Sequence, residues 1–371
     1  MSKPTNKRTI TLNSDQAGDW KLYFGVQDEH APGNPEELKR SDFKMIDATV
    51  PGNVEIDLQA AGLIEDPMIG INVRDLRKYE PFQWWYHRTF KAPEVSEAQR
   101  VEFCFDGIDC IADIWLNGRK IAHVENMFVE HHYDITELMK EGNELFVKIY
   151  STELAAREYF RNNFGVRYDQ LGEAVSIRKA PHMFGWDIMP RMLSAGIWRD
   201  VKLEVIDPTY FTSVYWVTKD VYPEDKKANM YVDWQFQTDR LYIDDLTMTI
   251  SLERNGENIY QKQFPLTTTI SRERIWGLEN VDFWWPRGFG VQPLYNATLR
   301  VSDKQGNVLA ENQQKIGIRT SELIVTPVNT KEKPGDFHFR VNGERIFIKG
   351  TNWVPLDGLH GRDIQHVDEA V

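Results

Sequence analysis

Residues 101–118, VEFCFDGIDCIADIWLNG, decide the fold class of the chain. Val101, Phe103 and Phe105 alternate with less apolar residues, and Ile114 begins a second run of the same kind. Successive side chains of a strand point to opposite faces of a sheet, so this alternation predicts two half-buried strands. The stretch ends in Asn-Gly, the dipeptide that favours a tight hairpin turn. We therefore expect the second strand to turn back into a third.

The same alternation extends over most of the sequence on either side of this stretch. Further Asn-Gly pairs at Asn255-Gly256 and Asn342-Gly343 fall between apolar runs and predict two more hairpins. Helical patterns are few and short, at residues 54–63 and 135–139. The sequence therefore predicts an all-β chain.

Two breaks in the pattern divide the chain into parts. Asp207-Pro208 ends a strand, and a polar stretch rich in Lys and Glu covers residues 327–335. Residues 1–206 hold more and longer strands with irregular loops, which predicts a jelly-roll β-sandwich. Residues 207–326 hold short strands with turns at the spacing of an immunoglobulin-like β-sandwich.

The last part, residues 327–371, lacks the elements of a complete domain. We expect a hairpin over residues 337–348, and residues 366–370 resemble the start of a helix. A hairpin and part of a helix cannot enclose a hydrophobic core. This part is therefore expected to be the start of a further domain.

Charge and hydropathy exclude two classes of partner. The chain has 44 Lys and Arg against 56 Asp and Glu, a formal charge of −12, and no basic stripe with interleaved aromatic residues. Such an acidic protein repels phosphate backbones, so we expect no nucleic-acid partner. No apolar run approaches the roughly 20 residues that span a bilayer, so we expect no membrane span.

The start of the chain, MSKPTN, has no apolar segment of the kind found in signal peptides. We therefore expect no signal peptide in this sequence. The compartment stays open between the cytoplasm and, for a parent protein whose signal has been removed, the periplasm or the exterior.

Cysteine and histidine usage predicts neither a disulfide nor a metal site. Cys104 and Cys110 are the only cysteines, and an extended chain holds them too far apart to bridge. The nine histidines show no metal-ligand spacing, since His131 and His132 are adjacent and strand alternation sends their rings to opposite faces.

Six stretches, in order along the chain, together resemble family 2 glycoside hydrolases. They are residues 50–63, 84–88, 105–118, 196–201, 285–295 and 347–355. The resemblance implies a galactose-binding-like jelly-roll domain, an immunoglobulin-like domain and, in the last stretch, the first strand of a catalytic (β/α)8 (TIM) barrel. It implies an oligosaccharide or glycan as the substrate and no cofactor.

A loop further along points to one subfamily. Residues 178–180, 184–187 and 190–191 resemble the β-mannosidase loop that reaches from the jelly roll to the active site. The usual pattern there is Trp-Asp-Trp-Gly-Pro-Arg, and this chain has Ile188 and Met189 in place of the second Trp and the Gly. The resemblance favours a mannoside substrate, ahead of galactoside, glucosaminide and glucuronide.

The resemblance also implies which residues contact the sugar. Asp187 would accept hydrogen bonds from two adjacent sugar hydroxyls, or else cap backbone N–H groups in its own loop. Trp186 would stack on the sugar ring or pack behind Asp187, and Arg178 would hold Asp187, contact the sugar or lie in solvent. Asn352 and Trp353, at the end of the expected barrel strand, would face the active site or pack in the barrel floor.

No catalytic residue is expected within the chain. Retaining glycosidases need two carboxylates about 5–5.5 Å apart, and the family places both, as glutamates, late in the barrel. The Asn-Glu pair here, Asn143-Glu144, opens a sandwich strand and is expected to be a turn. The chain is therefore expected to be the inactive N-terminal part of a retaining exo-β-glycosidase, with the rest of the barrel missing. The alternatives are a stand-alone carbohydrate-binding module or a family 2 hydrolase of another sugar.

Overall fold

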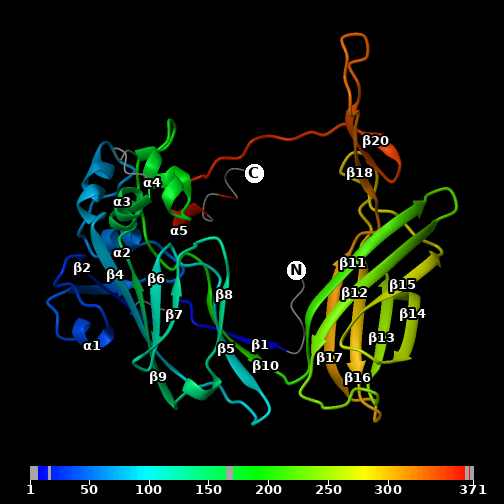
Figure 1. Cartoon of the computed structure of the whole chain (residues 1–371), viewed down its shortest axis with the longest axis horizontal. Helices are drawn as coiled ribbons and strands as arrows, with labels where there is room; N and C mark the ends of the chain where they lie inside the picture. Colours follow the sequence, from blue (N-terminus) through cyan, green and yellow to red (C-terminus); the bar gives the residue numbers. More distant parts are fainter. Residues whose placement is uncertain (1–6, 16–17, 164–169, 364–366, 368–371) are drawn as a thin grey trace. The chain divides into compact units, whose positions relative to one another are not determined.

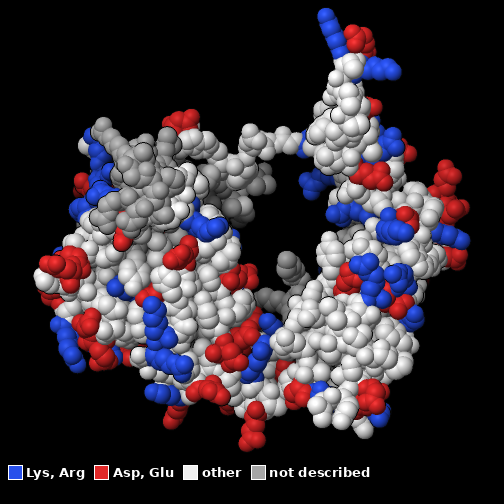
Figure 2. All heavy atoms as spheres, in the orientation of Figure 1, with Lys and Arg blue, Asp and Glu red and all other residues white. Residues whose placement is uncertain are grey.

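The computed structural model describes residues 7–15, 18–163, 170–363 and 367. The chain divides into two compact units (Figure 1). The first unit comprises residues 9–205 and 353–371, and the second comprises residues 1–8 and 206–352. Both are built mainly from antiparallel strands, which confirms the all-β fold class. Acidic and basic side chains are interspersed over the visible face of each unit (Figure 2).

The first unit holds a six-stranded and a four-stranded sheet. The six-stranded sheet has the order β3-β2-β4-β9-β6-β7 and is antiparallel throughout. Its strands are β2 (Trp20–Val26), β3 (Lys44–Ala48), β4 (Phe82–Lys91), β6 (Ala112–Leu116), β7 (Arg119–Val124) and β9 (Gly142–Ile149). The four-stranded sheet has the order β1-β10-β5-β8. Its strands are β1 (Lys7–Thr11), β5 (Arg100–Phe105), β8 (His131–Asp134) and β10 (Val201–Ile206).

Residues 101–118 contribute to β5, form β6 and make the turn into β7, as expected. Val101, Phe103 and Phe105 of β5 are buried in the core between the two sheets. All five residues of β6 are buried, because the outer face of this strand is covered as well. There Trp115 packs with Trp85, Phe146 and Leu38 of the short helix α1 (Pro35–Leu38).

The helices of the first unit, α1 apart, gather near one end of its sheets (Figure 1). The expected helix at residues 54–63 is α2 (Val54–Ala60), and the segment at residues 135–139 is a 3-10 turn, η2 (Thr136–Leu138). The helices α3 (Thr152–Asn163) and α4 (Gln170–Ser176) were not expected from the sequence. Two further 3-10 segments are η1 (Asn72–Tyr79) and η3 (Pro181–Phe184), and α5 (His360–Asp363) is a last short helix. None of the described helices is long and apolar enough to cross a bilayer.

The second unit is a sandwich of a three-stranded and a four-stranded antiparallel sheet. One has the order β11-β12-β15 and the other β14-β13-β16-β17. The strands are β11 (Tyr210–Tyr222), β12 (Lys227–Gln237), β13 (Thr247–Arg254), β14 (Glu257–Pro265), β15 (Ile270–Leu278), β16 (Tyr295–Ser302) and β17 (Val308–Ile316). Asn255 has a positive φ of 52° at the turn from β13 to β14, the conformation that a tight Asn-Gly hairpin requires.

A small third sheet of the second unit contains the last predicted hairpin. It has the order β18-β19-β20, with β18 (Ser321–Val325), β19 (Phe337–Val341) and β20 (Glu344–Ile346). Residues 347–355, expected as a barrel strand, form no regular element. A barrel strand is defined by its pairing with neighbouring barrel strands, so this expectation stays a prediction.

The chain returns to the first unit after residue 352. Leu359 is buried against Leu76 and Met192, and the N–H of Gly361 donates to Asn53 Oδ1 over 2.6 Å. Asp357 is buried and accepts from Arg362, at 2.7 Å from Nη2. These contacts fix the described part of the segment onto the first unit. Of the expected helix start, residues 366 and 368–370 lie outside the described residues.

Asn117 gives a test of how the opening hairpin is held. Its φ is +53°, and its side chain donates to Leu138 O at 2.8 Å and Asn143 Oδ1 at 2.9 Å and accepts from the Glu144 N–H at 2.9 Å. Asn117→Gly keeps the backbone conformation and removes these bonds, so we expect it to lower the free energy of unfolding by about 1–3 kcal/mol.

Asn117→Ala should cost more than Asn117→Gly, because alanine adds the strain of a positive φ. Urea denaturation followed by tryptophan fluorescence measures both variants. Wild-type stability of Asn117→Gly would show that the side-chain bonds contribute nothing.

Candidate functional site

The loop between α4 and β10 carries three of the predicted site residues, Arg178, Trp186 and Asp187. After η3, Gly185 turns the chain with a φ of +103°. The N–H of Trp186 then donates to Met189 O at 2.9 Å, and the N–H of Met189 donates back to Trp186 O at 3.2 Å. This pair of bonds closes a tight turn. Trp186, Asp187 and Ile188 form its tip, and all three side chains are exposed.

Arg191, at the base of this tip, is anchored in the interior. Its guanidinium donates to both oxygens of Glu80 over 2.9 Å, a bidentate pair, and also pairs with Glu173. Arg191, Glu80 and Glu173 are nearly inaccessible to solvent. Burial opposes the charge, but the hydrogen bonds with the two glutamates outweigh it and raise the pKa of Arg191. The tip thus projects from a rigidly held base.

A fully buried ion pair holds the first half of the loop. Lys179 Nζ lies 2.5 Å from Asp109 Oδ1 and donates to Ser194 O at 2.6 Å, with both charged side chains at 0% exposure. Burial raises the pKa of the Asp109 carboxyl, and Lys179 counteracts part of this shift. Lys179 therefore links the connection between β5 and β6, which carries Asp109, to the second half of the loop at Ser194.

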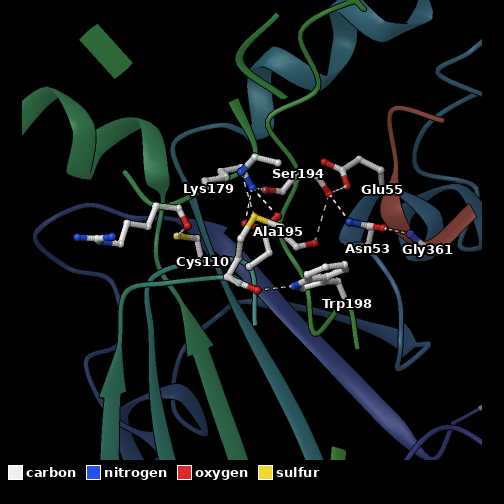
Figure 3. A network of polar contacts seen from close by, with 12 residues as sticks. Asn53, Glu55, Cys110, Lys179, Ser194, Ala195, Trp198 and Gly361 are labelled. Carbon is white, nitrogen blue, oxygen red and sulfur yellow. Dashed lines mark hydrogen bonds and ion pairs between the residues drawn. The ribbon is translucent and has the colours of Figure 1, made fainter. Parts of the chain in front are cut away.

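The same network continues through Ser194 to the start of α2 (Figure 3). The Ser194 hydroxyl accepts from Asn53 Nδ2 at 2.8 Å and donates to Glu55 Oε2. Figure 3 shows Asn53 between Ser194 and Gly361, whose N–H donates to the Asn53 side-chain oxygen. One amide side chain therefore joins the loop, α2 and α5.

Two buried carboxyls, Glu55 and Asp57, lie on α2. Burial raises the pKa of Glu55 to about 7, against a weaker opposing effect of the Ser194 hydroxyl. Burial likewise raises the pKa of Asp57 to about 8, and the Thr49 N–H, which donates to its Oδ1 at 2.8 Å, counteracts part of this. Asp57 is therefore mostly protonated at neutral pH, whereas Glu55 loses its proton near neutrality.

The structure places the predicted site residues as follows. Trp186 and Asp187 share the loop tip, and Arg178 begins the loop with its side chain in solvent. No hydrogen bond or ion pair joins Arg178 to Asp187 in the described structure, and the Arg178 carbonyl instead accepts from the Met127 N–H at 3.2 Å. Asn352 and Trp353 are exposed, in the segment that leads from the second unit to the first. The sugar contacts of all five residues stay predictions.

The residues that position the loop were not predicted from the sequence. Arg191 and Asn53 lie in the stretches that resemble family 2 hydrolases and β-mannosidases, but their partners lie outside them. Glu80 is 111 positions from Arg191, and Ser194 is 141 positions from Asn53. Lys179 directly follows the exposed Arg178, and the local sequence gives no sign that one points inward and the other outward. Asp109 stands between the apolar residues Ile108 and Cys110, and this was the available signal of a buried charge.

Two models of one protein family match the sequence of the chain. Residues 28–199 match the family model described as the glycosyl hydrolase 2 galactose-binding domain-like module, and residues 209–319 match the model of glycosyl hydrolases family 2. The chain belongs to glycosyl hydrolase family 2. The resemblance noted from the sequence is therefore confirmed.

Proteins similar to the chain include two curated β-mannosidases. The chain is 31% identical to β-mannosidase B of Emericella nidulans over 317 residues, which are 84% of this chain and 36% of that protein. It is 31% identical to the β-mannosidase of Mus musculus over 331 residues, 85% of this chain and 37% of that protein. The chain thus spans little more than a third of the length of these relatives.

A solved structure agrees with the sequence comparison. The crystal structure of the β-D-mannosidase from Dictyoglomus thermophilum matches with a TM-score of 0.75 and 26% identity. The match covers 96% of this chain and 41% of that one. The likeness to this solved structure therefore extends over nearly the whole chain.

The raised pKa of Asp57 predicts a pH-dependent stability. An unfolded chain releases the Asp57 proton near pH 3.8, the ordinary value, whereas the folded chain keeps it to about pH 8. The stability that the proton on Asp57 contributes is fully present below the pKa of the unfolded chain. It is lost as the pH rises through the pKa of the folded chain. The free energy of unfolding should therefore fall between about pH 4 and pH 8, by a few kcal/mol, since one pKa unit corresponds to about 1.4 kcal/mol.

Asp57→Asn keeps a side-chain acceptor for the Thr49 N–H and removes the titration. Its unfolding free energy, from urea denaturation at several pH values, should decline less than that of wild type over this range. Asp187→Asn, at the exposed loop tip, serves as the matched control and should follow wild type. Equal slopes for Asp57→Asn and wild type would contradict the assignment.

Proposed function

We propose that this chain is the sugar-binding and immunoglobulin-like part of a retaining exo-β-mannosidase, which removes terminal β-linked mannose from glycans. The observation that carries the proposal is the 31% identity to curated β-mannosidases over 84–85% of the chain. The coverage of those relatives, 36–37%, leaves room in them for a catalytic barrel beyond the matched part. We place the two catalytic glutamates in that barrel and none in this chain.

The loop of residues 177–198 is the proposed contribution of the chain to the active site. Asp187 would accept hydrogen bonds from two sugar hydroxyls, and Trp186 would offer an apolar ring face to the sugar. Two features support this role. The tip is exposed, and its base is held by the Arg191–Glu80 pair. The Asp187 carboxylate is therefore accessible and also held in position. A preorganised acceptor loses little entropy when it binds.

Arg178, Asn352 and Trp353 are proposed to complete the substrate contacts. Arg178 projects into solvent from the start of the same loop. Asn352 and Trp353 would take their place when the residues around them pair as the first barrel strand. Ile188 and Met189 depart from the usual pattern of this loop, so we expect the subsite around the tip to be less aromatic than in other β-mannosidases.

The direct test is hydrolysis of p-nitrophenyl β-mannoside by the chain and by the longer protein of its reading frame. We expect turnover by the longer protein alone, and less turnover of the matching galactoside, glucosaminide and glucuronide. Turnover by the 371-residue chain would place a catalytic pair within it and overturn the assignment. A reading frame that ends without a barrel, together with mannoside binding by the chain, would favour a stand-alone binding module.

Asp187→Asn in the longer protein tests the loop. Loss of a charge-assisted acceptor for two hydroxyls should lower kcat/KM by about 10²–10³-fold, which corresponds to roughly 3–4 kcal/mol of transition-state binding. Glu97→Gln, another exposed carboxylate, is the matched control and should leave kcat/KM unchanged. Wild-type kcat/KM for Asp187→Asn would remove the loop tip from the active site.

A further inference from the structure

Four potential metal ligands meet on the four-stranded sheet of the first unit. They are Glu102 and Cys104 of β5, His132 of β8 and Glu204 of β10, here called the outer-face cluster. One ligand atom from each lies within 4.8 Å of the others. The strands that carry them are neighbours in the order β10-β5-β8, so the sheet itself brings the four together.

Strand periodicity explains why all four side chains share one face. Glu102 and Cys104 are two residues apart on β5, and His132 stands directly opposite Cys104 in the register of β5 with β8. Glu204 lies on β10, on the other side of β5. The residues that alternate with these ligands fill the core between the sheets: Val101, Phe103, Leu203 and Val205. The cluster therefore lies on the face turned away from that core.

Two distances within the cluster are close to those around a tetrahedral ion. Cys104 Sγ lies 3.1 Å from His132 Nδ1, and Glu102 Oε2 lies 3.8 Å from the same nitrogen. Ligands of tetrahedral zinc are about 3.3–3.6 Å apart, given metal–ligand bonds of about 2.0–2.3 Å. Small side-chain rotations would bring all four atoms to such an ion.

The surroundings orient two of the ligands. Arg100 Nη2 binds Glu102 Oε1 at 2.8 Å, while the other oxygen, Oε2, faces the cluster. The second ring nitrogen of His132, Nε2, lies 3.6 Å from Glu130 Oε2. A carboxylate behind a ligating histidine is the usual second partner in metal sites, because it fixes the ring and raises the basicity of the ligating nitrogen.

We propose that the outer-face cluster is a structural Zn²⁺ site, with Cys104, His132, Glu102 and Glu204 as its four ligands. A thiolate and an imidazole select zinc over the hard cations Ca²⁺ and Mg²⁺, which require oxygen ligands. Four protein ligands fill a tetrahedral shell and leave no open position for catalysis. The ion would join β10, β5 and β8 on the outer face of the sheet. The proposal does not depend on the glycosidase activity of the chain.

Cysteine and histidine usage in the sequence predicted no metal site, and the outer-face cluster differs from that expectation. Adjacent His131 and His132 do diverge, since His131 Nε2 lies 3.4 Å from Asn126 O whereas His132 faces Cys104. The residues that join His132 in the outer-face cluster lie on other strands, so no local spacing in the sequence marks the site. Cys110, the other thiol, is buried near the carbonyls of Glu125 and Arg178.

Cobalt binding to the chain, after treatment with a chelator, tests the proposal. We expect one Co²⁺ per chain, with the visible bands of a tetrahedral ion and a thiolate-to-cobalt charge-transfer band, all displaced by Zn²⁺. Cys104→Ser and His132→Gln should abolish these bands. Glu130→Gln should weaken Co²⁺ binding by about 10-fold or more, as expected when the second partner of a histidine ligand is lost.

Matched controls separate a site from general effects of substitution. Cys110→Ser and His131→Gln replace the neighbouring residues of each type and should keep the full spectrum, and circular dichroism checks that each variant is folded. His132 is 40% exposed, so its replacement leaves the core intact. Absence of the charge-transfer band in the wild-type chain, or its persistence in Cys104→Ser, would overturn the proposal.

Discussion

The buried ion pair between Lys179 and Asp109 is the contact on which the candidate site depends. Both side chains are fully enclosed, and neither charge would be stable there without the other. Removal of one partner of such a pair typically costs about 3–5 kcal/mol, because the other is left charged and unpaired. Lys179 also reaches the Ser194 carbonyl, so a single ammonium group fixes both ends of the loop.

The loop therefore combines an immobile frame with an accessible tip. Its inner side chains, Lys179 and Arg191, are bound to carboxylates that belong to other parts of the unit. Between these two anchors the chain makes its tight turn and exposes Trp186 and Asp187. Functional groups on loops keep their geometry only when the supporting contacts are rigid, and here those contacts are ionic and dry. Burial of these charges costs free energy, and the ion pairs that result hold the loop in one position.

The fold was predictable from the sequence wherever one local pattern sufficed. Alternation at residues 101–118 and the Asn-Gly turns predicted strands and hairpins, because side-chain period and turn conformation are properties of a few neighbouring residues. The helices α3 and α4 were not predicted, since their apolar residues do not stand out within a strand-rich chain. The stretches that resemble family 2 hydrolases predicted the two sandwiches, and the family models confirm that resemblance.

The candidate site was predictable only at its tip. Trp186 and Asp187 came from a motif, whereas the pairs Lys179–Asp109 and Arg191–Glu80 join residues 70 and 111 positions apart. Cys104 and His132 meet for the same reason, through strand register. Such contacts arise only when the strands are paired, and a single sequence carries no direct record of that pairing. Burial of a charge is likewise a property of the folded unit.

The path of the chain has a mechanical consequence. Polypeptide leaves the first unit near residue 206 and re-enters it at residue 353, where Leu359 and Gly361 are held. Residues 206–352 are thus an insertion with two covalent tethers. A protease that cut either crossing would leave the halves linked through the other, at a high effective concentration of one for the other. Only a double cut would release the inserted sandwich, so the molecule tolerates a nick that would divide a chain of simple tandem domains.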